Sequence, residues 1–170
     1  MTGPARPVVA GADGSAASML AVAWAAAEAS RRGLPLTIAH VTGTRPDGPL
    51  LAESIVDDAR ELARSVAPRL AVRTVVRDGD PVEILTDLGR DCALLVVGHR
   101  GSDGHPGPGP GSTSEAVART APVTVAVVGM DEDRFPLERC TGPALPPPSA
   151  VRLDRPSTVP GPARTRVEAP

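Results

Sequence analysis

Residues 93–128 read ALLVVGHRGSDGHPGPGPGSTSEAVARTAPVTVAVV, and this stretch decides the fold class. An apolar, β-branched run (93–98) leads into a glycine-rich segment, then into a helix pattern that opens at Ser112 and ends near Pro122, and then into a second apolar run (123–128). Runs that are apolar on both faces are typical of strands covered by helices on each side of a parallel sheet. The stretch therefore predicts a strand, a glycine-rich loop, a helix and a parallel strand.

The same alternation extends toward the N-terminus. Three further strands are predicted at 8–12, 36–41 and 72–76. Helix patterns fill the gaps: one lies between Ser15 and Arg32 and stops at Gly33, one follows Leu51 and ends at Pro68, and a short one opens with Asp80 as N-cap and Pro81 in the first turn. Five strands alternating with four helices predict an α/β fold, a doubly wound, Rossmann-like, five-stranded parallel sheet over residues 5–130.

Proline is spread unevenly along the chain. Nine of the 20 prolines fall in residues 131–170, where apolar periodicity is also lost. Such a composition buries too little apolar surface to offset chain entropy, so this segment is predicted to be a disordered, proline-rich tail. The folded domain is predicted to end at about residue 130.

Composition excludes several classes of function. A net charge of −2 and only two aromatic residues, Trp24 and Phe135, argue against a nucleic-acid partner. The longest apolar stretch, 16–27, is shorter than the ~20 residues of a membrane span, and MTGPARP at the start does not resemble a signal peptide. The two cysteines lie 48 residues apart with no CxxC spacing. We expect a cytoplasmic protein without a membrane partner.

The carboxyl ends of the strands are where a ligand is expected. In doubly wound sheets, ligands bind near the point where the strand order reverses, here after Ala12, Val41 and Val97. Beyond the last of these, Gly98, Gly101, Gly111 and Ser112 follow the spacing G-x2-G-x9-G-S. Glycines let the backbone approach a ligand closely, the following helix presents N–H groups, and Arg100 adds a cation. This combination suits a polyphosphate.

Three segments resemble the universal stress protein family, in its ATP-binding branch. They are VVAGADGSAASMLAVAWAAAEASRRGLPLTIAHV at the front, then LLVVGHRG, then GSTSEAVARTAPVTVAVV, and the resemblance covers about residues 5–129. The family's glycine signature, G-x2-G-x9-G-[S/T], is matched by the spacing above.

The resemblance implies a bound nucleotide, ATP, which Mg²⁺ can accompany. Asp13 matches the acidic residue on the adenosine side, flanked by Ala12 and Gly14, and the backbone of Val41 matches the position that meets adenine. The residues matching those that hold ribose and phosphates are Gly98, Gly101, Gly111, Ser112 and Thr113. The resemblance also implies a homodimer through strand 123–128, since an uncovered apolar edge strand is a template for pairing.

The loop between the signature glycines departs from the family. Relatives carry a partly apolar stretch there, whereas this chain has SDGHPGPGP (102–110). Pro106, Pro108 and Pro110 lack N–H donors, and the three intervening glycines are costly to order. We expect ATP binding to be retained with weakened affinity.

Some of these residues have purely structural interpretations. Asp13 could cap the first helix or shape the turn before Gly14, and Ser112 with Glu115 forms a capping box. The residues His99, Asp103 and His105 are interpreted as loop polar residues rather than a metal site. His40 is interpreted as a packed histidine and Cys92 as an inert buried thiol.

Three functions remain open from the sequence. The first is a non-catalytic ATP-binding stress-response protein, in which nucleotide occupancy changes dimer or partner behaviour. The second is a nucleotide-free dimeric interaction module with a vestigial glycine loop. The third is an enzyme acting on ATP, which the lone Asp13 and the lack of a Ser/His/Asp constellation disfavour. The absence of lysine excludes a Walker P-loop and a receiver domain, and GADGS (11–15) breaks the dinucleotide-binding spacing.

Overall fold

The computed structural model describes residues 5–43, 48–99, 112–129 and 150–154. They form ten elements in the order β–α–β–α–β–α–β–α–β–β. The strands are β1 (Val8–Gly11), β2 (Leu36–Val41), β3 (Val72–Arg77), β4 (Leu94–Gly98), β5 (Val125–Gly129) and β6 (Ala150–Asp154). The helices are α1 (Ala16–Arg32), α2 (Gly48–Val66), α3 (Pro81–Gly89) and α4 (Ser112–Thr120).

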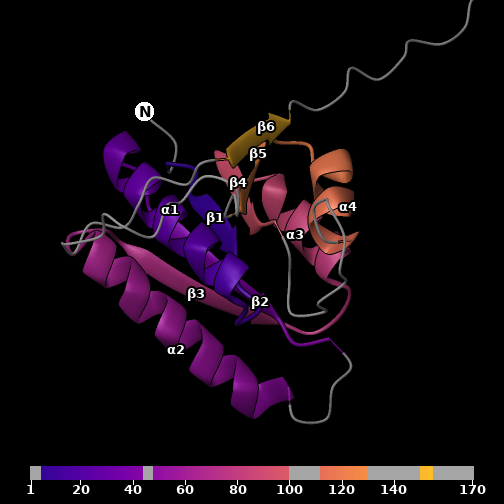
Figure 1. Ribbon diagram of the computed structural model, residues 1–170, viewed down its shortest axis with the longest axis horizontal. Helices are drawn as coiled ribbons and strands as arrows, with labels where there is room; N and C mark the ends of the chain where they lie inside the picture. The colour runs from indigo at the N-terminus through magenta and orange to yellow at the C-terminus, as the bar shows by residue number, and fades with distance from the viewer. Residues whose placement is uncertain (1–4, 44–47, 100–111, 130–149, 155–170) are drawn as a thin grey trace, which may run out of the picture.

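The strands build one sheet with the order β3-β2-β1-β4-β5-β6. The first five are mutually parallel, which confirms the predicted doubly wound sheet. The order reverses at β1, because the chain first adds strands on one side of β1 and then crosses to the other side at β4. Helices cover both faces, with α1 and α2 on one and α3 and α4 on the other (Figure 1).

Two apolar layers pack the sheet against its helices. Alternate residues of β1 point to opposite faces, so Val8 and Ala10 join the cluster under α1 and α2, whereas Val9 joins the cluster under α3 and α4. The first layer is rich in alanine from α1, which brings this helix close to the sheet; Ala21, Ala25, Ala26 and Ala29 are all fully buried. The position of α1 matters for the site, because its first turn reaches the end of β4.

The helix ends follow the local signals in the sequence. Gly33 adopts the left-handed conformation after α1, with a φ of 66°, as the predicted C-terminal glycine. Asp80 is the N-cap of α3, where its carboxylate accepts hydrogen bonds from the N–H groups of Val82 and Glu83. Pro81 occupies the first turn, as predicted. These local predictions are confirmed.

The structure differs from the sequence-based prediction in the tail. A disordered segment was expected over 131–170, but Ala150–Asp154 form β6, which pairs antiparallel with β5. The expected edge strand, 123–128, is therefore not an edge in this structure, because β5 lies between β4 and β6. Residues 130–149 and 155–170 lie outside the described part of the chain.

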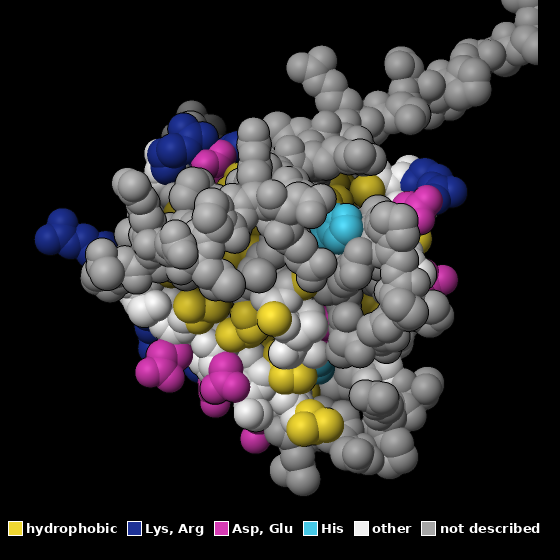
Figure 2. All heavy atoms as spheres, in the orientation of Figure 1, with side chains coloured by type: hydrophobic (Ala, Val, Ile, Leu, Met, Phe, Trp, Pro, Cys, Tyr) yellow, Lys and Arg dark blue, Asp and Glu magenta, His cyan; other side chains and the backbone are white. Residues whose placement is uncertain are grey.

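The face of the molecule seen in Figure 2 carries charges of both signs. On the face seen in Figure 2, the basic side chains of the described residues lie at separate points around the rim, with acidic side chains between or beside them. Among the helices that the structure describes, none is long and apolar enough to cross a membrane.

Candidate functional site

The carboxyl ends of β1 and β4 form the point where the strand order reverses. The two strands are neighbours in register, with Ala10 opposite Val96, so the turn after Gly11 lies beside the end of β4 at Gly98. The helices that follow these strands, α1 and α4, begin on opposite faces of the same edge. The structure thus brings the predicted residues 12–14 and Gly98 to one edge of the sheet, where doubly wound proteins bind ligands.

The turn after β1 is held by hydrogen bonds to the start of α1. An Asp13 carboxylate oxygen accepts the N–H of Ser15 at 2.9 Å, and the N–H of Asp13 donates to the hydroxyl of Ser18 at 3.2 Å. Gly14 has a φ of 81°, in the left-handed region that favours glycine. Asp13 therefore shapes the turn, as its structural interpretation predicts, while its side chain stays partly accessible.

His40 fixes the other side of this turn. Its ring is buried, and its Nδ1 lies 2.7 Å from the carbonyl oxygen of Ala12. A carbonyl oxygen can only accept, so the Nδ1–H of the histidine is the donor. The prediction of a packed histidine is confirmed. Its hydrogen bond ties Ala12, which follows β1, to the neighbouring strand β2.

Val41 ends β2 on the same edge of the sheet. It is half-buried and lies opposite Arg77 of β3. The next residue continues the sheet contact, since the N–H of Thr42 donates to the carbonyl oxygen of Arg77 at 2.9 Å. The backbone at Val41 is therefore held firmly one strand away from the Ala12–Gly14 turn.

Gly98 is required for the approach of α1 to β4. A Cβ atom built on Gly98 would lie 2.7 Å from the carbonyl carbon of Ala17 and 2.8 Å from the nitrogen of Ser18. Both are backbone atoms of the first turn of α1, and they cannot move aside as a flexible side chain could. The sequence predicted this glycine as a contact for a ligand, and the structure adds close packing between a strand and a helix as its physical reason.

A hydrogen bond joins the end of β4 to the start of α4. The buried hydroxyl of Ser114 donates to the carbonyl oxygen of Gly98 at 2.5 Å. Ser112 and Thr113 lie in the first turn of the same helix, and their side chains are exposed and half-exposed respectively. Glu115, in the same turn, forms an ion pair with Arg119. The two anchors of the glycine loop are thus fixed relative to each other.

Three of the predicted site residues lie outside the described part of the chain. They are Arg100, Gly101 and Gly111, together with the proline-containing stretch 102–110 and the loop residues Asp103 and His105. His99 is described, and its backbone N–H donates to the carbonyl oxygen of Val128 at 2.6 Å. No group of three metal-binding side chains occurs among the residues that can be placed.

Sequence reasoning missed two serines that organise the site. Ser18 lies within the alanine-rich run 16–27, and its hydroxyl accepts from the N–H of Asp13 and donates to the carbonyl oxygen of Ser15. Ser114 was not singled out at all. A buried serine near a helix start is a weak signal, because its partner lies 16 residues away in the case of Ser114.

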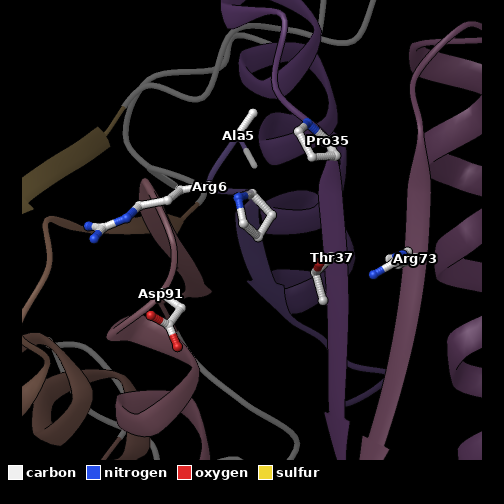
Figure 3. Close-up of a pocket in the computed structure, with 7 residues that line it drawn as sticks. Ala5, Arg6, Pro35, Thr37, Arg73 and Asp91 are labelled. Atoms are coloured by element: carbon white, nitrogen blue, oxygen red, sulfur yellow. The ribbon is translucent and has the colours of Figure 1, made fainter. Parts of the chain in front are cut away.

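A separate hollow lies at the other end of the strands from the candidate site. Its volume is about 720 Å³, and it is lined by Ala5, Arg6, Pro7, Pro35, Thr37, Arg73 and Asp91. Pro7 and Pro35 precede β1 and β2, so this hollow lies at the amino ends of the strands. Figure 3 shows the Arg6 guanidinium directed away from Thr37 and Arg73. None of the predicted site residues lines it.

Comparison with known proteins identifies a family for this architecture. Residues 4–129 match the model of the universal stress protein family. The universal stress protein Rv1996 of Mycobacterium tuberculosis is 37% identical over 147 residues, which cover 75% of this chain and 46% of the relative. Rv2623 of the same organism is 32% identical over 143 residues, covering 74% of this chain and 48% of the relative. The chain spans about half the length of these relatives.

Solved structures give the same answer. A universal stress protein in complex with cAMP is 29% identical, with a TM-score of 0.62, and the match covers 75% of this chain and 98% of that one. A universal stress protein from Archaeoglobus fulgidus in complex with dAMP shares the fold at 21% identity, with a TM-score of 0.61 and coverage of 74% and 98%. With its matched family model, doubly wound sheet and glycine-rich segment after β4, this chain belongs to the universal stress protein family.

Proposed function

We propose that this protein binds ATP across the carboxyl ends of β1 and β4 and acts without catalysis, with nucleotide occupancy altering its interactions in a stress response. The observation that carries the proposal is the convergence of the Asp13 turn and Gly98 at the switch point, with α4 tied to Gly98 through Ser114. The cAMP complex of a structure 29% identical to this chain supports an adenine nucleotide as the ligand class.

The chain's own groups suit the parts of an adenine nucleotide. The Asp13 carboxylate is partly accessible at the end of β1, and an ionised carboxylate accepts several hydrogen bonds, so it would accept one from a ribose hydroxyl. The backbone at Val41 would meet the adenine edge. The first turn of α4, which begins at Ser112, offers N–H groups and the positive end of a helix dipole to the phosphates.

Three further residues, all outside the described part of the chain, would complete the phosphate site. Gly101 and Gly111 would bring backbone N–H groups to the phosphates, and Arg100 would add charge. Mg²⁺ would be held mainly by the phosphates, in keeping with its preference for substrate oxygens and water. The metal neutralises phosphate charge when bound, and the residues of this chain orient the nucleotide.

The described groups at the site do not form a catalytic set. The Asp13 carboxylate is committed to the helix start, and the Nδ1–H of His40 is committed to the carbonyl of Ala12. In the proposed arrangement Asp13 accepts from the ribose and not from a reacting group, and nucleophilic catalysis would also need an activated nucleophile. We propose binding without turnover. We also propose a cytoplasmic location, which the free, buried Cys92 supports.

Isothermal titration calorimetry with ATP tests the proposal. We expect saturable heat from the full chain and at least about tenfold weaker binding for Asp13→Asn, because the amide oxygen can still accept from Ser15 while the charge is lost. Asp91→Asn is the matched control, since Asp91 is exposed at the other end of the strands from the candidate site. Its affinity should equal that of the parent protein.

Two outcomes would contradict the proposal. Absence of heat with ATP, AMP and cyclic AMP at millimolar concentration would favour the nucleotide-free interaction module instead. Steady phosphate release that disappears in Asp13→Asn would favour the enzyme. Mass spectrometry of small molecules released from the purified protein gives an independent reading, in which a co-purified adenine nucleotide supports the proposal.

A further inference from the structure

The two outer strands of the five-stranded parallel sheet, β3 and β5, differ in how well they are protected against pairing with another chain. On one side β3 is an edge strand, and it carries two exposed arginines, Arg73 and Arg77. Charged side chains on an edge discourage pairing with another chain. On the other side, β5 reads VAVVG, has no charged residue and is buried at every position. Left as an edge, β5 would be a short apolar template for a further strand.

The chain supplies that further strand itself. β6 pairs antiparallel with β5 over its whole length, from Val125 opposite Asp154 to Gly129 opposite Ala150 (Figure 1). Its sequence, AVRLD, contains Arg152 and Asp154, so the new edge strand again carries charges. With β6 in place, both edge strands of the sheet contain charged residues. The pairing therefore replaces an unprotected edge by one of the kind that resists association.

We propose that β6 is an intramolecular cap that occupies the β5 edge and keeps the protein monomeric, and that a second copy pairs with β5 only when β6 is displaced. This inference concerns assembly and does not depend on nucleotide binding. It changes the expectation of a homodimer through residues 123–128, because in this structure the same backbone groups are used within one chain.

The tether between the two strands favours the chain's own strand. Gly129 and Ala150 lie opposite each other, and 20 residues of the sequence connect them. Tethering by a short linker gives an effective concentration in the millimolar range. At micromolar protein, β6 of the same chain thus has an advantage on the order of 10²–10³-fold over a segment of equal affinity from a second copy.

A disulfide trap tests where β6 is seated. Val127 and Arg152 lie directly opposite in the register, and opposed residues in antiparallel strands bring their Cβ atoms to about 4.5–5.5 Å. The variant Val127→Cys, Arg152→Cys, with Cys140→Ser to remove the other thiol of the tail, would be oxidised and run on a non-reducing gel. We expect a link within one chain. A dimer linked between chains, or no link, would overturn the proposal.

A second experiment tests what the cap prevents. Successive residues of an antiparallel strand alternate between pairing with the neighbour and pointing away, so replacing two consecutive residues by proline removes at least one donor facing β5. The double variant Arg152→Pro, Leu153→Pro applies this to the full chain. The matched control is Arg164→Pro, Thr165→Pro, which makes the same change beyond β6.

The readout is the mass in solution, by sedimentation equilibrium from 1 to 100 μM. We expect monomers for the parent protein and the control, and a shift toward dimers for the variant in β6. A dimeric parent protein with the intrachain link would show that the cap does not prevent association. A β6 variant that stays monomeric while retaining its fold would show that β5 has no affinity for a second copy. Either result would overturn the proposal.

Discussion

The Ser114 hydroxyl donates a 2.5 Å hydrogen bond to the carbonyl oxygen of Gly98, and so connects the end of β4 to the first turn of α4. The glycine-rich segment 99–111 leaves the sheet at one of these residues and returns just before the other. The hydrogen bond fixes the distance between the two ends of the loop. A loop with fixed ends has less freedom to lose when a ligand binds.

Replacing Ser114 by alanine should lower both stability and nucleotide affinity. We expect a loss of about 1–2 kcal/mol in the free energy of unfolding, because a buried hydrogen bond is lost and a buried acceptor loses its partner. Urea denaturation measures this loss. Ser65→Ala is the matched control: Ser65 is exposed and donates to the carbonyl of Leu62 within its own helix, so it should cost less than about 0.5 kcal/mol. Equal effects of the two changes would contradict the prediction.

Gly98→Ala should destabilise the protein more than Gly11→Ala. A methyl group on Gly98 would meet backbone atoms of α1 at 2.7–2.8 Å, whereas one on Gly11 would lie at 3.4 Å or more from side chains of Leu85 and Val97. Forcing α1 away from β4 should cost about 1–3 kcal/mol. Thermal unfolding of the two variants side by side measures the difference. A smaller cost for Gly98→Ala than for Gly11→Ala would show that α1 yields easily.

Glu28 should contribute stability that disappears in acid. Hydrogen bonds from Arg31 and Arg32 lower the pKa of this carboxyl to about 2 from its usual 4.5. A lowered pKa in the folded state gives stability that is complete above pH 4.5 and is lost as the pH falls toward 2. Arg31 is 69% exposed, so solvent screens the pair and the contribution is about 0.5–1 kcal/mol at pH 7.

The measurement is the difference in unfolding free energy between the parent protein and Glu28→Gln from pH 7 to pH 2. The difference should be constant down to about pH 5 and then shrink toward zero. Glu61→Gln makes the same change on an exposed position of α2. A difference that grows on acidification would refute the assigned role of the arginines.

Cys92 should be unreactive in the folded protein. The thiol is buried and lies 3.6 Å from the carbonyl oxygen of Gly89, and burial raises its pKa to about 11. The thiolate is the reactive form, and at pH 8 only about one thiol in a thousand would carry the charge. In a Cys140→Ser background, we expect no alkylation by iodoacetamide at pH 8 until the protein is unfolded. Rapid labelling of the native protein would indicate local opening around β4.

The helix ends and the buried strands follow from residues that are close together in the sequence. Gly33 ends α1 because only a residue without a Cβ adopts its left-handed conformation at little cost. Asp80 and Pro81 start α3 through groups within three residues of each other. Continuous apolar runs such as 94–98 indicate strands that are buried on both faces. These signals need no distant partner, and this is why the element order could be predicted.

Contacts between distant residues set the details of the candidate site. Gly98 was recognisable as a glycine in a motif, but its packing against Ala17 depends on how closely α1 approaches the sheet. His40 and Ala12 lie 28 residues apart, and Ser114 and Gly98 lie 16 residues apart. No sequence motif indicates that either pair forms a hydrogen bond. Such hydrogen bonds form only after the strands are aligned.

The sequence by itself determined the doubly wound sheet, the helix ends and the position of the glycine segment after β4, because these follow from the periodicity and capping of neighbouring residues. Only the tertiary structure decided that Ala150–Asp154 form a strand. Five residues of a proline-rich tail bury too little surface by themselves to offset the entropy lost when their backbone is fixed. The hydrogen bonds that hold them as a strand come from the edge of β5. β6 is a strand because it pairs with β5, and this pairing in turn makes β5 an interior strand of the sheet.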